Sequence, residues 1–322
     1  MANLGYIQVT RLCNQKCRIC SNPESPATIS IDEGRRIIDD FIERGYDGII
    51  LTGGEPTLYE HLRDLISYAV EKGIHARLIT NGQKIHDIVF LKSLIDAGLG
   101  HIHVSIQSVR EETQAFLTRN GDSLKNILGS LENIGKTGIN ADINTPISHY
   151  NAEHLDENVI FLTDRFPFLR HFVWNNLDPT MNRATENPDV IPKLREFEIS
   201  LMKAMRFLDK TGRTFRVERV PLCYMAEYAH CSTETRKIVK GEERIVHFLD
   251  SKGMVHQTAF NHGKTDCCDA CSVNSICAGL YEMDRYYSSQ ELYPLFISSE
   301  KIAEKVLDDS DNRFFNSRQQ CV

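Results

Sequence analysis

Short β-rich segments alternate with helical patterns through the first two thirds of this chain of 322 residues. Six strands are expected, at residues 6–10, 48–52, 76–80, 101–106, 141–145 and 171–174. Parallel neighbours need a long crossover between them, and a helix fits each gap. Right-handed crossovers in series curl such strands into a barrel or an open doubly wound sheet, and periodicity alone does not choose between the two.

Helices are expected at 31–43, 62–72, 87–97, 124–137 and 155–166, with a longer one at 191–208. Ser30 and Glu33 have the spacing of a capping box at the start of the first helix. Several helices are followed directly by a glycine, which suits the left-handed turn that ends a helix. These glycines are Gly45, Gly73, Gly98 and Gly138.

The repeat stops after the longest helix, so we expect a core domain at 1–210 and a second domain at 211–322. In the second part, segments 244–249 and 254–260 flank an Asp-Ser-Lys-Gly sequence, which predicts a hairpin. The polar end after Lys305 is expected to be solvated.

Ten cysteines occur in the chain, and its other features indicate a reducing compartment. No apolar run approaches the roughly 20 residues that span a bilayer, and the N-terminus lacks the pattern of a secretory signal. We therefore expect a cytoplasmic protein whose cysteines are metal ligands or reactive groups rather than disulfides. The net charge of −7 argues against general binding to nucleic acid or an anionic membrane.

Cys13, Cys17 and Cys20 follow the first expected strand with the spacing Cys-x3-Cys-x2-Cys. Three thiolates so close in sequence can surround one metal centre. Structural zinc usually takes four nitrogen or sulfur ligands, whereas three cysteines on a [4Fe–4S] cube leave one iron open. From the residues alone, a cube with an open iron and a zinc or electron-transfer site with a distant fourth ligand both remain possible.

The second expected strand runs into Gly53, Gly54, Glu55 and Pro56. Two glycines let a ligand approach the backbone closely, and the proline favours an extended Glu55 that directs its groups out of the loop. The segment lacks the sequence of a phosphate-binding loop. By itself it fits a plain turn better than a binding site.

Together, the two motifs closely resemble those of radical S-adenosylmethionine (SAM) enzymes, over about residues 4–210. The resemblance implies a partial (β/α)6 barrel of the TIM type. It also implies that Cys13, Cys17 and Cys20 hold a [4Fe–4S] cluster whose open iron chelates the amino and carboxylate groups of SAM. Reductive cleavage of SAM would then give a 5′-deoxyadenosyl radical that abstracts a hydrogen atom from a substrate.

The resemblance extends to SAM contacts. Gly53, Gly54 and Glu55 match the segment that receives the SAM amino group, and Ile19 matches an apolar position that packs on the adenine. The ends of the later strands would converge on the C-terminal face of a barrel, where active sites lie. They carry the further candidates Asn81, Ser105, Gln107 and Asn144, each also a residue typical of turns or caps.

A second cysteine group, Cys268, Cys271 and Cys277, follows the expected hairpin with the spacing Cys-x2-Cys-x5-Cys. On spacing alone, a zinc ribbon and an iron–sulfur site are about equally favoured. After a radical SAM core, the region resembles the auxiliary-cluster extensions called SPASM, with two clusters, or twitch, with one. Tyr281 and Thr258 stand where the two-cluster form has cysteines, so the resemblance implies one auxiliary [4Fe–4S] cluster.

We expect Cys223 to be the fourth ligand of this auxiliary cluster. If it is not a ligand, it could donate a hydrogen atom to a substrate radical. Cys231 and Cys321 are rival ligands, and Cys267 could replace its neighbour Cys268.

Weaker features are expected to be structural. His101 and His103 alternate with apolar residues on the fourth strand, so we interpret them as packed or surface histidines rather than ligands. Arg219 and Arg236 are interpreted as surface charges rather than anion-binding groups.

The sequence therefore predicts a radical SAM enzyme with oxidoreductase- or lyase-type chemistry, and oxidation, cross-linking or epimerisation of a small molecule or peptide. An electron donor such as flavodoxin or ferredoxin would reduce the cluster. The first strand begins within ten residues of the N-terminus, which favours a small molecule or a leader-independent peptide. The competing prediction is a non-catalytic binding or electron-transfer module stabilised by zinc or an iron–sulfur cluster.

Overall fold

A computed structural model describes residues 4–180, 182–250 and 252–308. In these residues, nine strands form one sheet in the order β7-β6-β5-β4-β3-β2-β1-β8-β9. Neighbouring strands are parallel except for the antiparallel hairpin β8–β9. The strands are β1 Leu4–Thr10, β2 Gly48–Gly53, β3 His75–Thr80, β4 His101–Ser105, β5 Asn140–Ile147, β6 His171–Asn176, β7 Thr214–Glu218, β8 Arg244–His247 and β9 Met254–Gln257.

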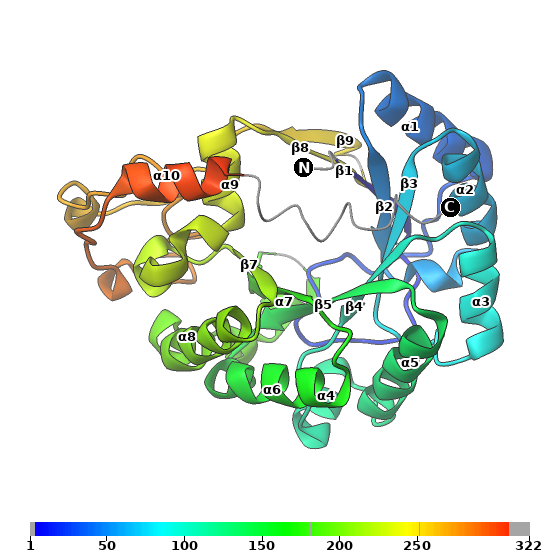
Figure 1. Cartoon of the computed structure of the whole chain (residues 1–322), viewed down its shortest axis with the longest axis horizontal. Helices are drawn as coiled ribbons and strands as arrows, with labels where there is room; N and C mark the ends of the chain where they lie inside the picture. Colours follow the sequence, from blue (N-terminus) through cyan, green and yellow to red (C-terminus); the bar gives the residue numbers. More distant parts are fainter. Residues whose placement is uncertain (1–3, 181, 251, 309–322) are drawn as a thin grey trace.

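The sheet is curved but does not close into a complete barrel. From β1 to β7 the strand order follows the chain, and β8 pairs with the free edge of β1 at Tyr6 and Ile7. Helices lie on the outer side of the curved sheet, and α9 and α10 lie on the side opposite α1–α3 (Figure 1). This arrangement confirms the expected partial barrel of the TIM type and decides against a doubly wound sheet.

All six expected helices are present. They are α1 Ile31–Glu43, α2 Leu62–Glu71, α3 Ile88–Asp96, α5 Ser123–Thr137, α6 Leu155–Arg165 and α8 Leu194–Lys210. The Ser30 side chain caps α1 by accepting a hydrogen bond from the backbone N–H of Glu33. Gly138 ends α5 at a φ of 71°, in the left-handed region that favours glycine. No helix of the described residues is both long enough and apolar enough to cross a membrane.

Five elements were not anticipated from the sequence. They are β7 and the helices α4 Glu111–Thr118, α7 Asn182–Glu186, α9 Thr233–Lys240 and α10 Ser299–Leu307. All five are short, so each contains too few residues for a clear apolar period. Because β7 pairs with β6, the sheet continues past residue 210, and the division into domains at 1–210 and 211–322 stays a prediction.

The two faces of the sheet differ in chemistry. One side of each strand is apolar and fully buried, as at Ile7, Leu78 and Phe172, and it packs against the surrounding helices in one large core. The alternate residues face the interior of the curve, because successive side chains of a strand point to opposite faces. Many of these inner residues are polar or charged, such as Ser105 and Arg216, so the interior is lined for binding rather than filled with apolar side chains.

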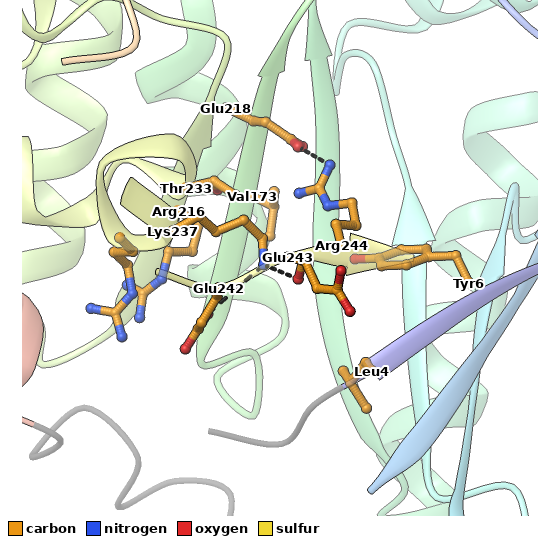
Figure 2. Close-up of a pocket in the computed structure, with 11 residues that line it drawn as sticks. Leu4, Tyr6, Val173, Arg216, Glu218, Thr233, Lys237, Glu242, Glu243 and Arg244 are labelled. Carbon is orange, nitrogen blue, oxygen red and sulfur yellow. Dashed lines mark hydrogen bonds and ion pairs between the residues drawn. The ribbon is translucent and has the colours of Figure 1, made fainter. Parts of the chain in front are cut away.

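An ion pair bridges the opening between β7 and β8. Arg244 Nη1 lies 2.5 Å from Glu218 Oε1, and both side chains are at most one-fifth exposed. The Arg244 guanidinium also lies over the ring of Tyr6, 5.7 Å from its centre. Figure 2 shows this pair within a cavity of about 370 Å³ that is lined from both sides of the opening. We call this opening the seam.

Replacing Arg244 with methionine is expected to lower the free energy of unfolding by about 3 kcal/mol, because it leaves the Glu218 carboxylate largely buried without its guanidinium partner. Urea-induced unfolding measures this. The matched control is Arg110→Met, which breaks an ion pair of 2.6 Å to Glu157 in which both side chains are about half exposed. The control is expected to cost less than about 1 kcal/mol, and equal losses in the two variants would show that the seam pair is not stabilising.

Candidate functional site

The first cysteine group lies in the loop after β1, at the edge of the sheet where the parallel strands end. Cys13 is exposed, and Cys17 and Cys20 are partly buried. Burial, together with the neighbouring Cys20 and Cys13, raises the pKa of the Cys17 thiol to about 12. The three thiols are therefore close enough to repel one another as thiolates. A cation held between the three sulfurs would offset the energetic cost of burying the thiolates and would reduce their mutual repulsion.

The loop is fixed by very close contact with the end of β2. The backbone N–H of Gly54 donates to the Thr10 carbonyl at 2.6 Å, and that of Glu55 donates to the Leu12 carbonyl at 2.7 Å. A Cβ on Gly53 would lie 2.2 Å from the Thr10 oxygen, and one on Gly54 would lie 2.2 Å from the Leu12 oxygen. In this structure, the backbone that approaches the two glycines belongs to residues 10–12 of the same chain, which directly precede Cys13.

Glu55 is extended, as expected from the following proline, with φ −124° and ψ 104°. Its side chain, however, does not point out of the loop, because it is 1% exposed and accepts four hydrogen bonds. The donors are the backbone N–H and hydroxyl of Thr57, the hydroxyl of Thr80 and the backbone N–H of Asn81. Burial raises the pKa of Glu55, and these donors oppose that rise. The carboxylate thus ties the end of β2 to the end of β3.

Asn81 reaches the cysteine loop. Its side-chain amide donates to the Asn14 side chain at 2.7 Å and lies 3.8 Å from the sulfur of Cys13. Of the polar strand-end candidates, it is the one with a direct contact to a cysteine of the group.

Ser105 and Asn144 lie side by side on the inner face of the sheet, because they are register partners on β4 and β5. The Asn144 side-chain oxygen accepts a hydrogen bond from Asn175 of β6. These three residues form a polar row just inside the edge that carries the cysteine loop. Nothing in the sequence connects Asn175 with Asn144, because the two residues are brought together by the pairing of β5 with β6.

Gln107 is 6% exposed and belongs to a network of buried amides. Its side-chain oxygen accepts from Gln114 at 2.8 Å, and Gln114 also donates to the Ser123 hydroxyl at 2.9 Å. Gln15, which lies between the first two cysteines, donates to the same hydroxyl at 3.0 Å. In this structure, Gln107 therefore supports the cysteine loop through a chain of hydrogen bonds. Gln15 and Gln114 were missed because neither belongs to a recognisable motif.

Ile19 is buried beneath the loop, where it packs with Leu117, Leu177 and Val190. The neighbouring Arg18 stacks on the ring of Phe116 at 4.2 Å. The C-terminal end of α4 therefore supports the segment between the last two cysteines.

Arg183 of α7 is a further residue that sequence reasoning missed. Its Nε donates to the Cys17 carbonyl at 3.0 Å, and its Nη1 pairs with Glu24 at 2.6 Å. Its positive charge lowers the pKa of Cys17 and of Cys13 against the effect of burial. A fixed cation beside the thiols favours the deprotonated sulfurs that a metal requires.

The second cysteine group is assembled from distant parts of the chain. Burial raises the pKa of Cys223 to about 12, with further contributions from Cys277 and Cys268. Backbone N–H groups donate to the sulfurs of Cys271 and Cys277 at 3.3 and 3.4 Å. The structure therefore places Cys223 near Cys277 and Cys268, and its role as the fourth ligand stays a prediction.

The remaining cysteines differ from these four. Cys231, the rival ligand, is 6% exposed and lies in the hydrophobic core. Cys267 lies beside the group, and burial together with Cys268 and Cys271 raises its pKa. Cys321 is outside the described residues.

Comparison with known proteins identifies the domain that contains the first cysteine group. A family model for the radical SAM superfamily matches residues 7–162. The chain carries a radical SAM domain. That domain comprises β1 to β5 with the cysteine loop, the Gly53–Gly54 contact and most of α6.

The radical SAM domain has relatives among enzymes of different activities. Fe-coproporphyrin III synthase from Methanosarcina barkeri is 34% identical over 151 residues, which cover 46% of this chain and 37% of that protein. PqqA peptide cyclase from Granulibacter bethesdensis is 29% identical over 152 residues, which cover 46% of this chain and 40% of that protein. In both cases the match spans well under half the length of the relative.

A solved structure extends the likeness in fold beyond the radical SAM domain. The structure of anSMEcpe with bound AdoMet and a Kp18Cys peptide superposes with a TM-score of 0.63 and covers 98% of each chain. At 16% sequence identity, this likeness concerns the fold, including the part that carries the second cysteine group.

Substituting Gly54 with alanine is expected to lower the free energy of unfolding by about 1–3 kcal/mol, because the new Cβ overlaps the Leu12 and Arg11 carbonyl oxygens. The displaced loop should also retain less iron at Cys13, Cys17 and Cys20. Iron analysis and denaturant unfolding measure the two effects. Gly121→Ala is the control, since a Cβ there meets no atom within 4 Å. Full iron retention by Gly54→Ala would contradict the view that this contact positions the loop.

Proposed function

We propose that this protein is a radical SAM enzyme that binds a [4Fe–4S] cluster through Cys13, Cys17 and Cys20. When bound, the cluster and SAM supply an electron transfer and a 5′-deoxyadenosyl radical that removes a hydrogen atom from the substrate. The observation that carries the proposal is the group of three mutually close thiols on the edge of the sheet, beside the Arg183 guanidinium and within the radical SAM domain.

The number of thiols supports an open-iron cluster rather than a structural zinc ion. The loop supplies three cysteines, whereas a structural zinc ion usually takes four nitrogen or sulfur ligands. Three thiolates on a [4Fe–4S] cube leave one iron open, which is the position that SAM would occupy.

The protein's own residues bind and orient the reactants in this proposal. Gly53, Gly54 and Glu55 fix the loop to the sheet and provide the backbone edge expected to receive the SAM amino group. Ser105 and Asn144 offer a hydroxyl and an amide on the inner face beside it, where the ribose and carboxylate of SAM could be held. Asn81 is expected to assist from β3.

The second cysteine group is proposed to hold one auxiliary [4Fe–4S] cluster in a twitch-like domain at 211–322. Cys268, Cys271 and Cys277 would supply three thiolates, and Cys223 would supply the fourth. The proximity of Cys223 to Cys277 and Cys268 supports this ligand set over a role of Cys223 as hydrogen-atom donor.

The proposed substrate is a peptide or a small molecule. A peptide is supported by the relative named PqqA peptide cyclase and by the peptide bound to anSMEcpe, whereas Fe-coproporphyrin III synthase is named for a different product. The cluster would receive electrons from flavodoxin or ferredoxin in the cytoplasm. The alternative of a non-catalytic module is less favoured, because both relatives bear the names of enzymes.

Anaerobic reconstitution with iron and sulfide, followed by SAM and dithionite, should yield 5′-deoxyadenosine that chromatography can quantify. Cys17→Ala should reduce its formation at least about a hundredfold, because the open-iron cluster needs all three thiolates. Cys231→Ala is the matched control and should retain activity, since that thiol lies in the hydrophobic core. Reconstituted wild-type protein with full iron that neither binds SAM nor forms 5′-deoxyadenosine would refute the proposal.

Iron content tests the auxiliary cluster. Two cubes require about eight iron atoms per chain, and Cys223→Ala should lower this number toward about four while Cys231→Ala leaves it unchanged. The 5′-deoxyadenosine assay of Cys223→Ala reports separately on the first cluster. A wild-type content of about four, lost completely in the variant with Cys13, Cys17 and Cys20 all changed to alanine, would rule out a second cluster.

A further inference from the structure

Two histidines and an aspartate converge on the inner face of the sheet, away from both cysteine groups. His101 and His103 lie on β4, and Asp142 is the register partner of His103 on β5. Asp142 Oδ2 is 2.8 Å from His101 Nε2 and 3.3 Å from His103 Nδ1. Among the described residues, this trio has its ligand atoms within 4.8 Å of one another. The interpretation of the two histidines as separate packed side chains therefore misses their convergence.

The trio is enclosed by the fold. The three side chains are 7–15% exposed, and the two imidazole rings lie 4.7 Å apart at an angle of 33°. Nε2 of His103 is buried and has no hydrogen-bond partner among the described residues.

We propose that His101, His103 and Asp142 bind a divalent transition-metal ion of the Zn²⁺ class. Two imidazole nitrogens and a carboxylate oxygen form a donor set that such ions prefer. With bonds of about 2.0–2.1 Å, neighbouring ligand atoms of a tetrahedral zinc ion lie roughly 3.3 Å apart, close to the distances found here. Three protein ligands leave at least one position for water or another oxygen ligand.

The coordination position that the three protein ligands leave open faces the interior of the curved sheet. Ser105 and Asn144 each lie two residues beyond His103 and Asp142 on the same strands. The metal would therefore sit on the same inner face, roughly 7 Å deeper than the row of polar strand ends. An ion there would face the interior of the curved sheet, on the side of Ser105 and Asn144 that lies away from the strand ends. The inference does not depend on the proposed radical chemistry.

The nearby charges set the affinity. Arg77 of β3 is close enough that its charge acts on both Asp142 and His103. His171 of β6 is a register partner of Asp142, and its Nδ1 is bonded to the Thr214 hydroxyl at 2.7 Å. Arg77 opposes a bound cation, so Arg77→Gln is expected to tighten metal binding by about tenfold or more. A gain of affinity cannot arise from misfolding.

The experiment uses the anaerobic, cluster-loaded protein dialysed against Zn²⁺, with zinc and iron counted by mass spectrometry. Wild type should retain about one zinc per chain in addition to its iron. Zinc-edge X-ray absorption should show nitrogen and oxygen neighbours without sulfur, which separates this site from the cysteines. His103→Ala and Asp142→Asn should lose at least about nine-tenths of the zinc with iron unchanged. His75→Ala, at an exposed position of β3, is the control.

Three results would overturn the assignment: no zinc beyond the iron in wild type, sulfur in the zinc shell, or equal zinc in wild type and Asp142→Asn. Unchanged affinity in Arg77→Gln would also count against it, because the guanidinium would then not face the ion. Iron content and circular dichroism confirm that each variant is folded.

Discussion

The close contact between the ends of β1 and β2 fixes the position of the cysteine loop and of the strand ends beside it. Two parallel strands usually diverge where their hydrogen-bond ladder ends, but here the ladder continues from Gly54 to Thr10 and from Glu55 to Leu12. Only residues without a Cβ allow the two backbones to approach so closely. The chain therefore enters the cysteine loop from a rigid strand end, and the first cysteine follows directly.

One buried carboxylate extends this rigidity to the third strand. A charge in an apolar environment requires hydrogen-bond donors, and Glu55 takes its donors from Thr57, Thr80 and Asn81. The backbone of Asn81 is held in place by this bond, and its side chain then meets Asn14 and Cys13. Three strand ends and the cysteine loop are thus linked through residues that the sequence motif alone would assign to ligand binding.

The sequence predicts the periodic parts of this structure well and the long-range contacts poorly. Six strands and six helices follow from apolar spacing, whereas β7 was missed because only Phe215 and Val217 alternate with polar residues over five positions. Both cysteine groups follow from local spacing. Arg183 could not be predicted, since it meets Cys17 across 166 positions in the chain, and such contacts are decided by how the elements pack.

The incomplete closure of the sheet explains why its interior can be polar. In a closed eight-stranded barrel, inward side chains fill the centre in apolar layers. Here the seam between β7 and β8 is bridged by Glu218 and Arg244 and opens into a cavity. Solvent at the seam lowers the cost of placing charges inside, and opposite charges are paired across it, as in Glu218 with Arg244. An open barrel therefore keeps successive rows of polar groups beneath the cysteine loop available for binding, which a closed barrel of the same size could not.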